Sequence, residues 1–238
     1  MNHGIKREMS FPISGHVRQE YEEIKAENKV LLIGLTGGIA SGKSTAARFL
    51  KEMGSDIIDF DLLARQVVTP GQKAWGKIVE YFGEDILLDN REIDRKKISG
   101  IVFLDPEKRE ILEGFTHPAI GEAFVREVAR IASSRDNAII QAVVPLLIEC
   151  KMQELFHAIT LVYIHMEKQV VRLAERDGIT RDSAMNIIHA QMPIDEKIGY
   201  ADFIINNDGP IIETKIQTQR VWEKLLEIQK GSERKGRL

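Results

Sequence analysis

Short apolar runs alternate along this chain with stretches in which apolar residues recur every three or four positions. Five of the runs have the length and the near-continuous apolar character of strands that are covered on both faces, at residues 30–36, 56–59, 138–144, 158–165 and 203–206. The stretches between them have helical periodicity, which is typical of βαβ units. The pattern therefore predicts an α/β fold with a parallel sheet flanked by helices.

The spacing of the runs also predicts how the chain is divided. Residues 1–29 are polar, and we expect at most a short helix near residues 19–25, without an apolar face strong enough to anchor it. Residues 62–137 have helical periodicity and no convincing strand, and this interval is too long for a simple crossover. We expect a helical, ligand-binding insertion here, at the carboxyl edge of the sheet, within one domain at residues 30–230.

Composition narrows the class of protein. A chain of 238 residues with 43% hydrophobic residues can bury a full core, and its one cysteine, Cys150, excludes an internal disulfide framework. It shows no secretory signal and no apolar run near 18 residues, so we expect a soluble, cytoplasmic protein with no membrane partner. The net charge of −3 argues against nucleic-acid binding and favours small ligands. The sequence does not specify an oligomeric state, and residues 231–238 predict a frayed, charged tail.

The most specific motif follows the first apolar run. Residues 37–45 read Gly-Gly-Ile-Ala-Ser-Gly-Lys-Ser-Thr and fit the phosphate-binding pattern G-x-x-x-x-G-K-[S/T]. Glycines let the backbone N–H groups approach phosphate oxygens, and the helix that begins near Lys43 adds its dipole. A Gly-rich turn with an incidental lysine is the alternative, but the strand before the motif and the helical pattern after it disfavour it. We therefore predict a nucleoside triphosphate site in which Lys43 neutralises the outer phosphates, Ser44 ligates magnesium, and the loop is formed by Gly38, Ala40, Ser41, Gly42, Lys43, Ser44 and Thr45.

Two carboxylates follow the second apolar run. Asp59 and Asp61 stand at the carboxyl end of that strand, beside the expected phosphate loop. A carboxylate there can accept a proton from an attacking hydroxyl or reach magnesium through water. Asp61 is alternatively the N-cap of a helix at residues 62–68, and one residue can serve both purposes.

Two arginines follow the fourth run. Arg172 and Arg176 are four residues apart on a predicted helix and so share a face, where they can clamp transferring phosphate charge. Gly178 and the restart signal at Thr180 indicate a helix-turn-helix within residues 166–200, which suits a lid. The alternative is an ordinary solvated face with salt bridges.

Together these motifs resemble the dephospho-CoA kinase family in order and spacing. They are L-T-G-G-I at 35–39, S-G-K-S-T at 41–45, I-D-x-D at 58–61, P-G at 70–71, F-G at 82–83, I-D-R at 93–95, H-P at 117–118, P-L-L-x-E at 145–149, Q-x-x-R-x-x-x-R at 169–176 and A-D-x-I-I-x-N at 201–207. The resemblance implies transfer of the terminal phosphate of ATP, with Mg²⁺, to the ribose 3'-hydroxyl of dephospho-CoA, which is the last step of coenzyme A synthesis.

The resemblance also implies roles for single residues. Asp61 would be the general base, Arg172 the lid arginine that stabilises the phosphoryl group, and Arg176 a further ATP contact. The acceptor region would include Asp59, Asp61, His117, Pro118, Leu146 and Glu149. His117 and Pro118 equally fit a helix-entry turn, Leu146 a pocket wall, and Glu149 a residue that orients the lid or the substrate.

One position departs from the family pattern, and two other functions stay open. Ala40 stands where the family usually has glycine, which adds a methyl group and is costly if φ is positive there; we expect a small local change and retained binding. The alternatives are a P-loop kinase of a nucleoside monophosphate or other small metabolite, and a nucleotide-dependent regulator or ATPase without an acceptor.

Overall fold

The protein is described by a computed structural model that covers residue 13 and residues 15–26 and 30–235. Its contacts form two compact units. Of the described residues, one unit contains 23–26, 30–58 and 130–235, and we call it the sheet unit. The other contains residue 13 and residues 15–22 and 59–129, and we call it the helical unit.

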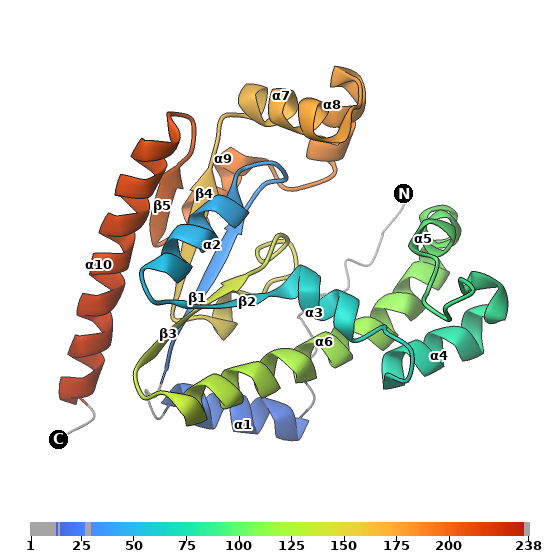
Figure 1. Ribbon diagram of the computed structural model, residues 1–238, viewed down its shortest axis with the longest axis horizontal. Helices are drawn as coiled ribbons and strands as arrows, with labels where there is room; N and C mark the ends of the chain where they lie inside the picture. The colour runs from blue at the N-terminus through green and yellow to red at the C-terminus, as the bar shows by residue number, and fades with distance from the viewer. Residues whose placement is uncertain (1–12, 14, 27–29, 236–238) are drawn as a thin grey trace, which may run out of the picture. The chain divides into compact units, whose positions relative to one another are not determined.

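Within the described residues, the sheet has five strands in the order β2-β3-β1-β4-β5 (Figure 1). The pairs β1–β3, β1–β4 and β4–β5 are parallel. The α/β prediction is confirmed, and each strand ends within two residues of its predicted bounds: β1 Val30–Gly37, β2 Asp56–Asp59, β3 Ala138–Val143, β4 Ala158–Tyr163 and β5 Phe203–Asn206. Every residue of β1, β3 and β4 is buried, as expected for strands covered on both faces.

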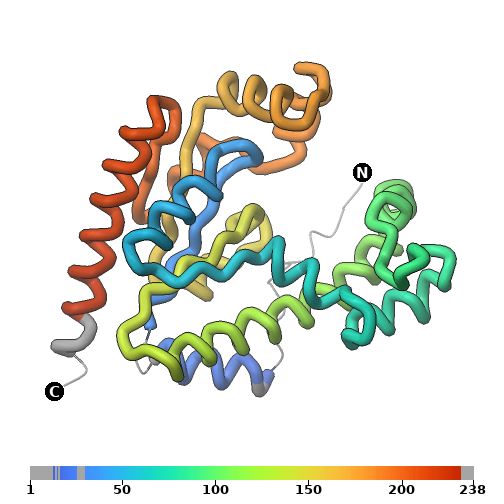
Figure 2. Tube along the Cα trace, viewed as in Figure 1, coloured from blue at the N-terminus to red at the C-terminus, as the bar shows by residue number. Residues whose placement is uncertain are grey.

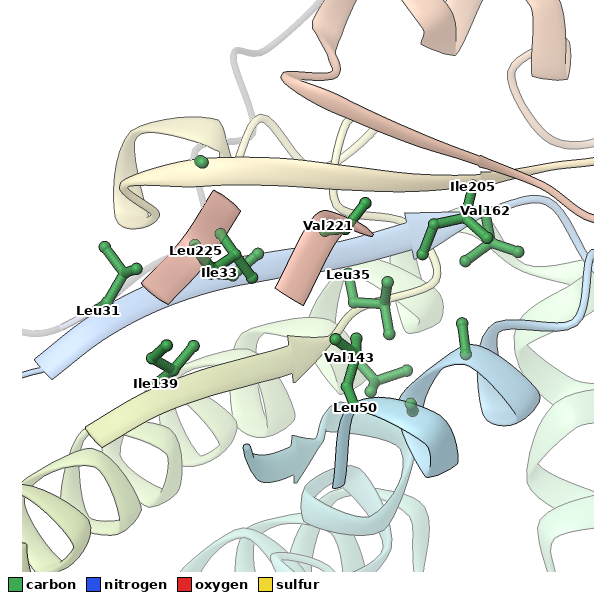
Figure 3. Close-up of a cluster of buried hydrophobic side chains, with 13 residues drawn as sticks. Leu31, Ile33, Leu35, Leu50, Ile139, Val143, Val162, Ile205, Val221 and Leu225 are labelled. Atoms are coloured by element: carbon green, nitrogen blue, oxygen red, sulfur yellow. The ribbon is translucent and has the colours of Figure 1, made fainter. Parts of the chain in front are cut away.

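One face of the sheet is covered by α2 (Lys43–Glu52) and α10 (Ile211–Lys235), which contact each other (Figure 2). The apolar cluster between these helices and the sheet contains alternate residues of β1 and β3, as Figure 3 shows for Leu31, Ile33 and Leu35. Leu50 of α2 and Leu225 of α10 are fully buried in the same cluster. This cluster fixes the end of β1, from which the phosphate loop leaves, against the helix that follows the loop.

The opposite side of β1 is held by residues of a loop that begins after β3. Position 34 has room only for glycine, because a Cβ atom there would lie 2.4 Å from the side chain of Leu147 and 2.9 Å from that of Phe156. His157 accepts a hydrogen bond from Leu32 N–H at its Nδ1 (3.0 Å) and donates its own N–H to Leu32 O (2.8 Å). Burial, followed by the charge of Lys25, lowers the pKa of His157. The neutral imidazole is therefore part of the support of β1.

A series of helices follows β4. Helix α7 (Met166–Asp177) ends at Gly178, which has φ 64°, and Thr180 caps α8 (Arg181–His189) by accepting Ser183 N–H. The helix-turn-helix prediction is thus correct in its turn residues. The chain continues through α9 (Ile194–Lys197) and the 3-10 turn η3 (Ile198–Tyr200) into β5.

The helical unit is built from short helices and the long helix α6 around its own apolar cluster. Its elements are α3 (Phe60–Gln66), α4 (Lys73–Phe82), η1 (Glu84–Ile86), α5 (Arg95–Leu104) and most of α6 (Pro106–Ser134). Ile78, Ile86, Ile93 and Ile98 form the centre of the cluster. An antiparallel bridge between Leu87 and Ile93 closes a turn, and Trp75 Nε1–H donates to Arg91 O in that turn.

Two predictions about the chain ends need correction. Helix α1 (Gly15–Ala26) is longer than expected, and it is anchored: Tyr21 is fully buried, with its ring centre 5.7 Å from that of Phe124. The anchoring partner lies about a hundred residues away, so no local pattern revealed it. Helix α10 extends to residue 235, beyond the predicted start of the tail. The other residues predicted at the two ends, 1–12, 14, 27–29 and 236–238, lie outside the described part.

None of the helices in the described part is both long and apolar enough to cross a bilayer.

Candidate active site

The phosphate loop joins the central strand β1 to α2. Gly42 is the N-cap of α2 with φ 95°, and it supplies no capping side chain. A Cβ atom at Gly42 would lie 2.1 Å from Asn207 Nδ2, so this position needs glycine both for its backbone angle and for space. Thr45 and Ala46 N–H donate to Gly42 O, which starts the helix at once. The amino end of α2 is thus presented with the dipole and geometry that bind phosphate.

Lys43 lies over this loop. Its Nζ donates to Gly37 O at 3.0 Å and to Gly38 O at 2.9 Å. Both acceptors are loop carbonyls, so the ammonium group is held where a phosphate would meet the backbone. Ser44 is exposed in the first turn of α2, and its hydroxyl is a hard oxygen donor of the kind magnesium prefers.

Ala40 has φ 56°, so the loop does require a positive φ at the position where the family usually has glycine. A non-glycine residue in this region costs about 1–2 kcal/mol. The alanine has a compensating contact, because Ala40 and Ile39 pack against Val170, Leu173 and Ile188 of α7 and α8. The phosphate loop and the predicted lid helices α7 and α8 therefore share one apolar cluster.

Three polar side chains to which the sequence motifs gave no individual role support the loop backbone. Buried Gln169 donates Nε2–H to Ile39 O at 2.7 Å, and Gln191 Oε1 accepts Ile39 N–H at 3.0 Å. Asn207 donates Nδ2–H to Ser41 O at 2.7 Å and accepts Thr214 Oγ1–H, also at 2.7 Å. The contacts of Gln169, Gln191 and Asn207 with the loop backbone join residues that are 130, 152 and 166 positions apart in the sequence. The motif Q-x-x-R at 169–172 was the sequence signal that could have found Gln169.

Arg172 is brought to the phosphate loop, whereas Arg176 is not. Half-buried Arg172 donates Nη2–H to Asn207 O at 2.9 Å, and its Nη1 would lie 3.9 Å from a Cβ atom at Gly42. Arg176 shares the helix face but forms a double hydrogen bond to its neighbour Asp177, at 2.7 and 3.0 Å. This contact raises the pKa of Arg176 and lowers that of Asp177.

Glu149 follows β3 and contacts the end of the lid region. Its Oε1 lies 2.7 Å from Nζ of Lys197, which is fully buried, and it accepts Met192 N–H at 3.2 Å. Glu149 thus contacts residues of the predicted lid region, Met192 and Lys197. Leu146, three residues earlier, is exposed.

The two aspartates at the carboxyl end of β2, Asp59 and Asp61, do not agree with one alternative, that Asp61 is the helix cap. The N-cap of α3 is Asp59, whose Oδ1 accepts Asp61 N–H at 2.8 Å and Leu62 N–H at 3.4 Å. The prediction that Asp61 caps this helix is therefore wrong, because the helix begins at Phe60 and leaves Asp61 within its first turn. The Asp61 side chain is exposed and, among the described residues, makes no hydrogen bond or ion pair.

His117 and Pro118 lie inside α6, about a dozen residues from its start. The alternative of a helix-entry turn is therefore wrong. Both side chains are half-buried in the helical unit.

The comparisons with known proteins fit this arrangement. The sequence model of the family named dephospho-CoA kinase matches residues 31–213. The chain belongs to the dephospho-CoA kinase family. The resemblance drawn from the motifs is thus confirmed.

Relatives and solved structures agree with this assignment. A dephospho-CoA kinase of Geobacter metallireducens is 47% identical over 200 residues, which cover 83% of this chain and 98% of that protein. One of Syntrophus aciditrophicus is 44% identical over 197 residues, covering 83% and 84%. The structure of a Thermus thermophilus protein has a TM-score of 0.70 at 28% identity, covering 80% of this chain and 95% of that one. A Campylobacter jejuni dephospho-CoA kinase has a TM-score of 0.58 at 26% identity, covering 83% and 98%.

Proposed function

We infer that this chain is an ATP-dependent kinase that phosphorylates the ribose 3'-hydroxyl of dephospho-CoA, giving coenzyme A and ADP. The observation that carries this inference is the family match over residues 31–213, which includes the phosphate loop, the two carboxylates after β2 and the lid arginines. Phosphoryl transfer depends mainly on positioning and on charge stabilisation, and the loop offers both.

The phosphate loop residues Gly38 to Thr45 would hold the ATP phosphates, with Lys43 moving from its two loop carbonyls to the outer phosphate oxygens. Ser44 fits a magnesium ligand because its exposed hydroxyl stands in the first turn of α2. In the described part no group of three or more His, Cys, Asp or Glu side chains is placed to hold a metal ion. The residues therefore suit an ion that arrives with the nucleotide and keeps phosphate and water ligands, as Mg²⁺ usually does. Its chemistry would be to neutralise charge on the phosphates.

On the acceptor side, Asp61 would take the proton of the 3'-hydroxyl as this oxygen attacks the γ-phosphorus and ADP leaves. Asp61 is suited to this role because its side chain is exposed and unpaired among the described residues, while Asp59 is engaged as a cap. His117, Pro118 and Leu146 would contribute to the acceptor region, and Glu149 would orient the lid through Lys197.

Arg172 would stabilise the phosphoryl group in flight. It is a guanidinium beside Gly42, so its charge is available next to the phosphate loop. Arg176 would contribute less, since Asp177 already binds it. We further propose that the enzyme works on small molecules in the cytoplasm, without a nucleic-acid partner, in line with its net charge of −3.

The deciding experiment is a coupled assay of ADP release with and without dephospho-CoA. We expect release to depend on dephospho-CoA and the product to be coenzyme A, and Lys43→Ala to be folded but nearly inactive because the charge on the outer phosphates is lost. Release that depends on a nucleoside monophosphate instead would favour another small-molecule kinase. Slow release that ignores every acceptor would favour a regulatory ATPase.

A further inference from the structure

Five arginines lie between residues 59 and 129, and they fall into two groups. Three are ion-paired: Arg91 with Glu84 at 3.2 Å, Arg109 with Glu113 at 3.8 Å, and Arg126 with Glu122 at 3.8 Å. Within the described part of the chain, Arg65 and Arg95 have no carboxylate at ion-pair distance. These two arginines, from α3 and from the start of α5, line the same pocket.

This pocket lies entirely within the helical unit and has a volume of about 220 Å³. Val68 and Ile93 give it apolar walls, and both belong to the apolar cluster of the unit, so these walls are fixed by the core. Arg65, Arg95 and Glu92 supply its charges. Pockets for complete drug-sized ligands usually measure about 300–1,000 Å³. This one therefore suits an anionic group with an apolar neighbour, as one part of a larger ligand.

Helix α3 links the pocket to the proposed base. Asp61 and Arg65 are four residues apart on this helix, so their Cβ atoms lie about 5–6 Å apart on one face. Such a pair often forms a salt bridge, but Arg65 lines the pocket and is not paired with Asp61. One turn of α3 thus carries a carboxylate that can accept a proton from a hydroxyl group and a guanidinium group that can bind an anion.

The proposed acceptor has these two groups at matching positions. In dephospho-CoA, the 3'-hydroxyl and the 5'-diphosphate leave the same ribose ring, and a branched aliphatic segment follows the diphosphate. The diphosphate needs cations other than those that serve ATP, and guanidinium groups match phosphate oxygens well.

We propose that Arg65 and Arg95 bind the 5'-diphosphate of the acceptor, with Val68 and Ile93 against the aliphatic segment next to it. This proposal rests on the proposed function and adds the residues that recognise the acceptor. Glu92 offers a hydrogen-bond acceptor to the hydroxyl and amide groups of the same arm. Arg65 then fixes the ribose relative to Asp61.

The test is calorimetric titration of dephospho-CoA into the whole protein without ATP, for the wild type, Arg65→Met and Arg95→Met. Methionine keeps an apolar stem and removes the charge. Losing hydrogen bonds to a charged group is worth about 1.5–3 kcal/mol, so we expect the dissociation constant to rise roughly 10-fold to 100-fold in each variant. Arg109→Met is the matched control, because Arg109 is paired with Glu113 outside the pocket, and it should bind like the wild type.

Two further measurements separate recognition from a structural role. Each methionine variant should lose part of the salt dependence of dephospho-CoA binding, while its melting temperature and its KM for ATP stay unchanged. Unchanged affinity in both variants would overturn the proposal, as would weaker binding with a full salt dependence and a lowered melting temperature. A wild type that binds dephospho-CoA without phosphorylating it would overturn the proposed function and leave the binding result standing. A wild type that does not bind it would overturn both.

Discussion

The phosphate loop in the sheet unit and the proposed acceptor residues in the helical unit differ in whether other residues of the protein hold them in place. Backbone groups of Ile39 and Ser41 are fixed by Gln169, Gln191 and Asn207, and the loop shares an apolar cluster with α7 and α8. Asp61, Arg65 and Arg95 are exposed, and none has a partner among the described side chains.

This difference separates stability from function. The loop is organised before any nucleotide arrives, which is how fixed dipoles and charges become effective in a transition state. We therefore expect the residues that support it to contribute both to the fold and to activity. The proposed acceptor side chains would gain partners only from the substrate, so changing them should affect affinity or turnover with little effect on stability. Four experiments test this difference between the two groups of residues.

The largest effect is expected at Arg172. Arg172→Ala should lower kcat by about 1,000-fold or more, the lower range for an arginine that stabilises a transferring phosphoryl group, and should change ATP affinity much less. Arg172→Lys should recover little, because an ammonium group lacks the planar fork. Steady-state kinetics and nucleotide titration measure both quantities. Arg176→Ala is the control one turn away, with a smaller expected loss because Asp177 binds Arg176. Equal losses of ATP affinity and kcat at Arg172 would make it a ground-state binding residue.

The next effect distinguishes the two carboxylates. Asp61→Asn cannot accept the hydroxyl proton, so kcat should fall by about 100-fold to 10,000-fold, with the melting temperature and dephospho-CoA binding nearly intact. Asp59→Asn should keep the cap of α3, because asparagine caps about as well as aspartate, and should keep most of the turnover. Turnover and melting curves of both variants decide the matter. A larger loss of turnover at Asp59 would transfer the role of base to that residue.

A smaller effect is expected at the glutamines that support the loop. The experiment makes the same substitution, glutamine to glutamate, at both of them. Gln169 donates to Ile39 O, whereas Gln191 accepts from Ile39 N–H. Glutamate is an acceptor only when ionised, so Gln191→Glu should keep its bond, while Gln169→Glu should place a buried carboxylate against a carbonyl. We expect kcat/KM for ATP to fall about 10-fold to 100-fold for Gln169→Glu and less than about threefold for Gln191→Glu.

The result has a stability readout as well. Gln169→Glu should also lower the melting temperature, because Gln169 supports the fold and the loop together. Equal effects of the two substitutions would show that the hydrogen bonds to Ile39 do not set the loop geometry. A normal melting temperature with lost activity in Gln169→Glu would contradict the expectation that residues supporting the phosphate loop contribute to both stability and activity.

The sequence predicted those parts of the molecule that depend on local patterns. The five strands were found within two residues because each is a short apolar run, and the loop was found because its glycines, Lys43 and Ser44 are adjacent in the chain. The turn between α7 and α8 was found from Gly178 and Thr180 for the same reason.

What the sequence missed depends on contacts between distant residues. Gln169 and Gln191 reach Ile39 across 130 and 152 positions, and Tyr21 is buried against Phe124, so no window along the chain contains either contact. The sequence offered Asp61 as one possible cap of α3, whereas Asp59 is the cap, because helix ends shift easily by one or two residues. The pocket at Arg65 and Arg95 was missed because these two lining residues come from separate helices, α3 and α5, and no local pattern joins them.

The smallest effect concerns the support of β1 by His157. Burial and the charge of Lys25 lower its pKa in the folded protein, so below the ordinary value of about 6.5 the unfolded chain binds more protons than the folded one. The contribution of His157 is therefore complete above about pH 6.5 and decreases as the pH falls below it, by at most about 1.4 kcal/mol per pH unit for one group. Denaturant unfolding between about pH 5 and pH 7.5 measures this slope.

His157→Asn removes the titrating ring while keeping an acceptor for Leu32 N–H, so its free energy of unfolding should be lower at pH 7 but should change less with pH. Lys25→Met removes the second cause of the lowered pKa and should give a slope between those of the wild type and His157→Asn. An unchanged slope in His157→Asn would mean that other groups set the pH dependence and that the imidazole supports β1 equally well in either charge state.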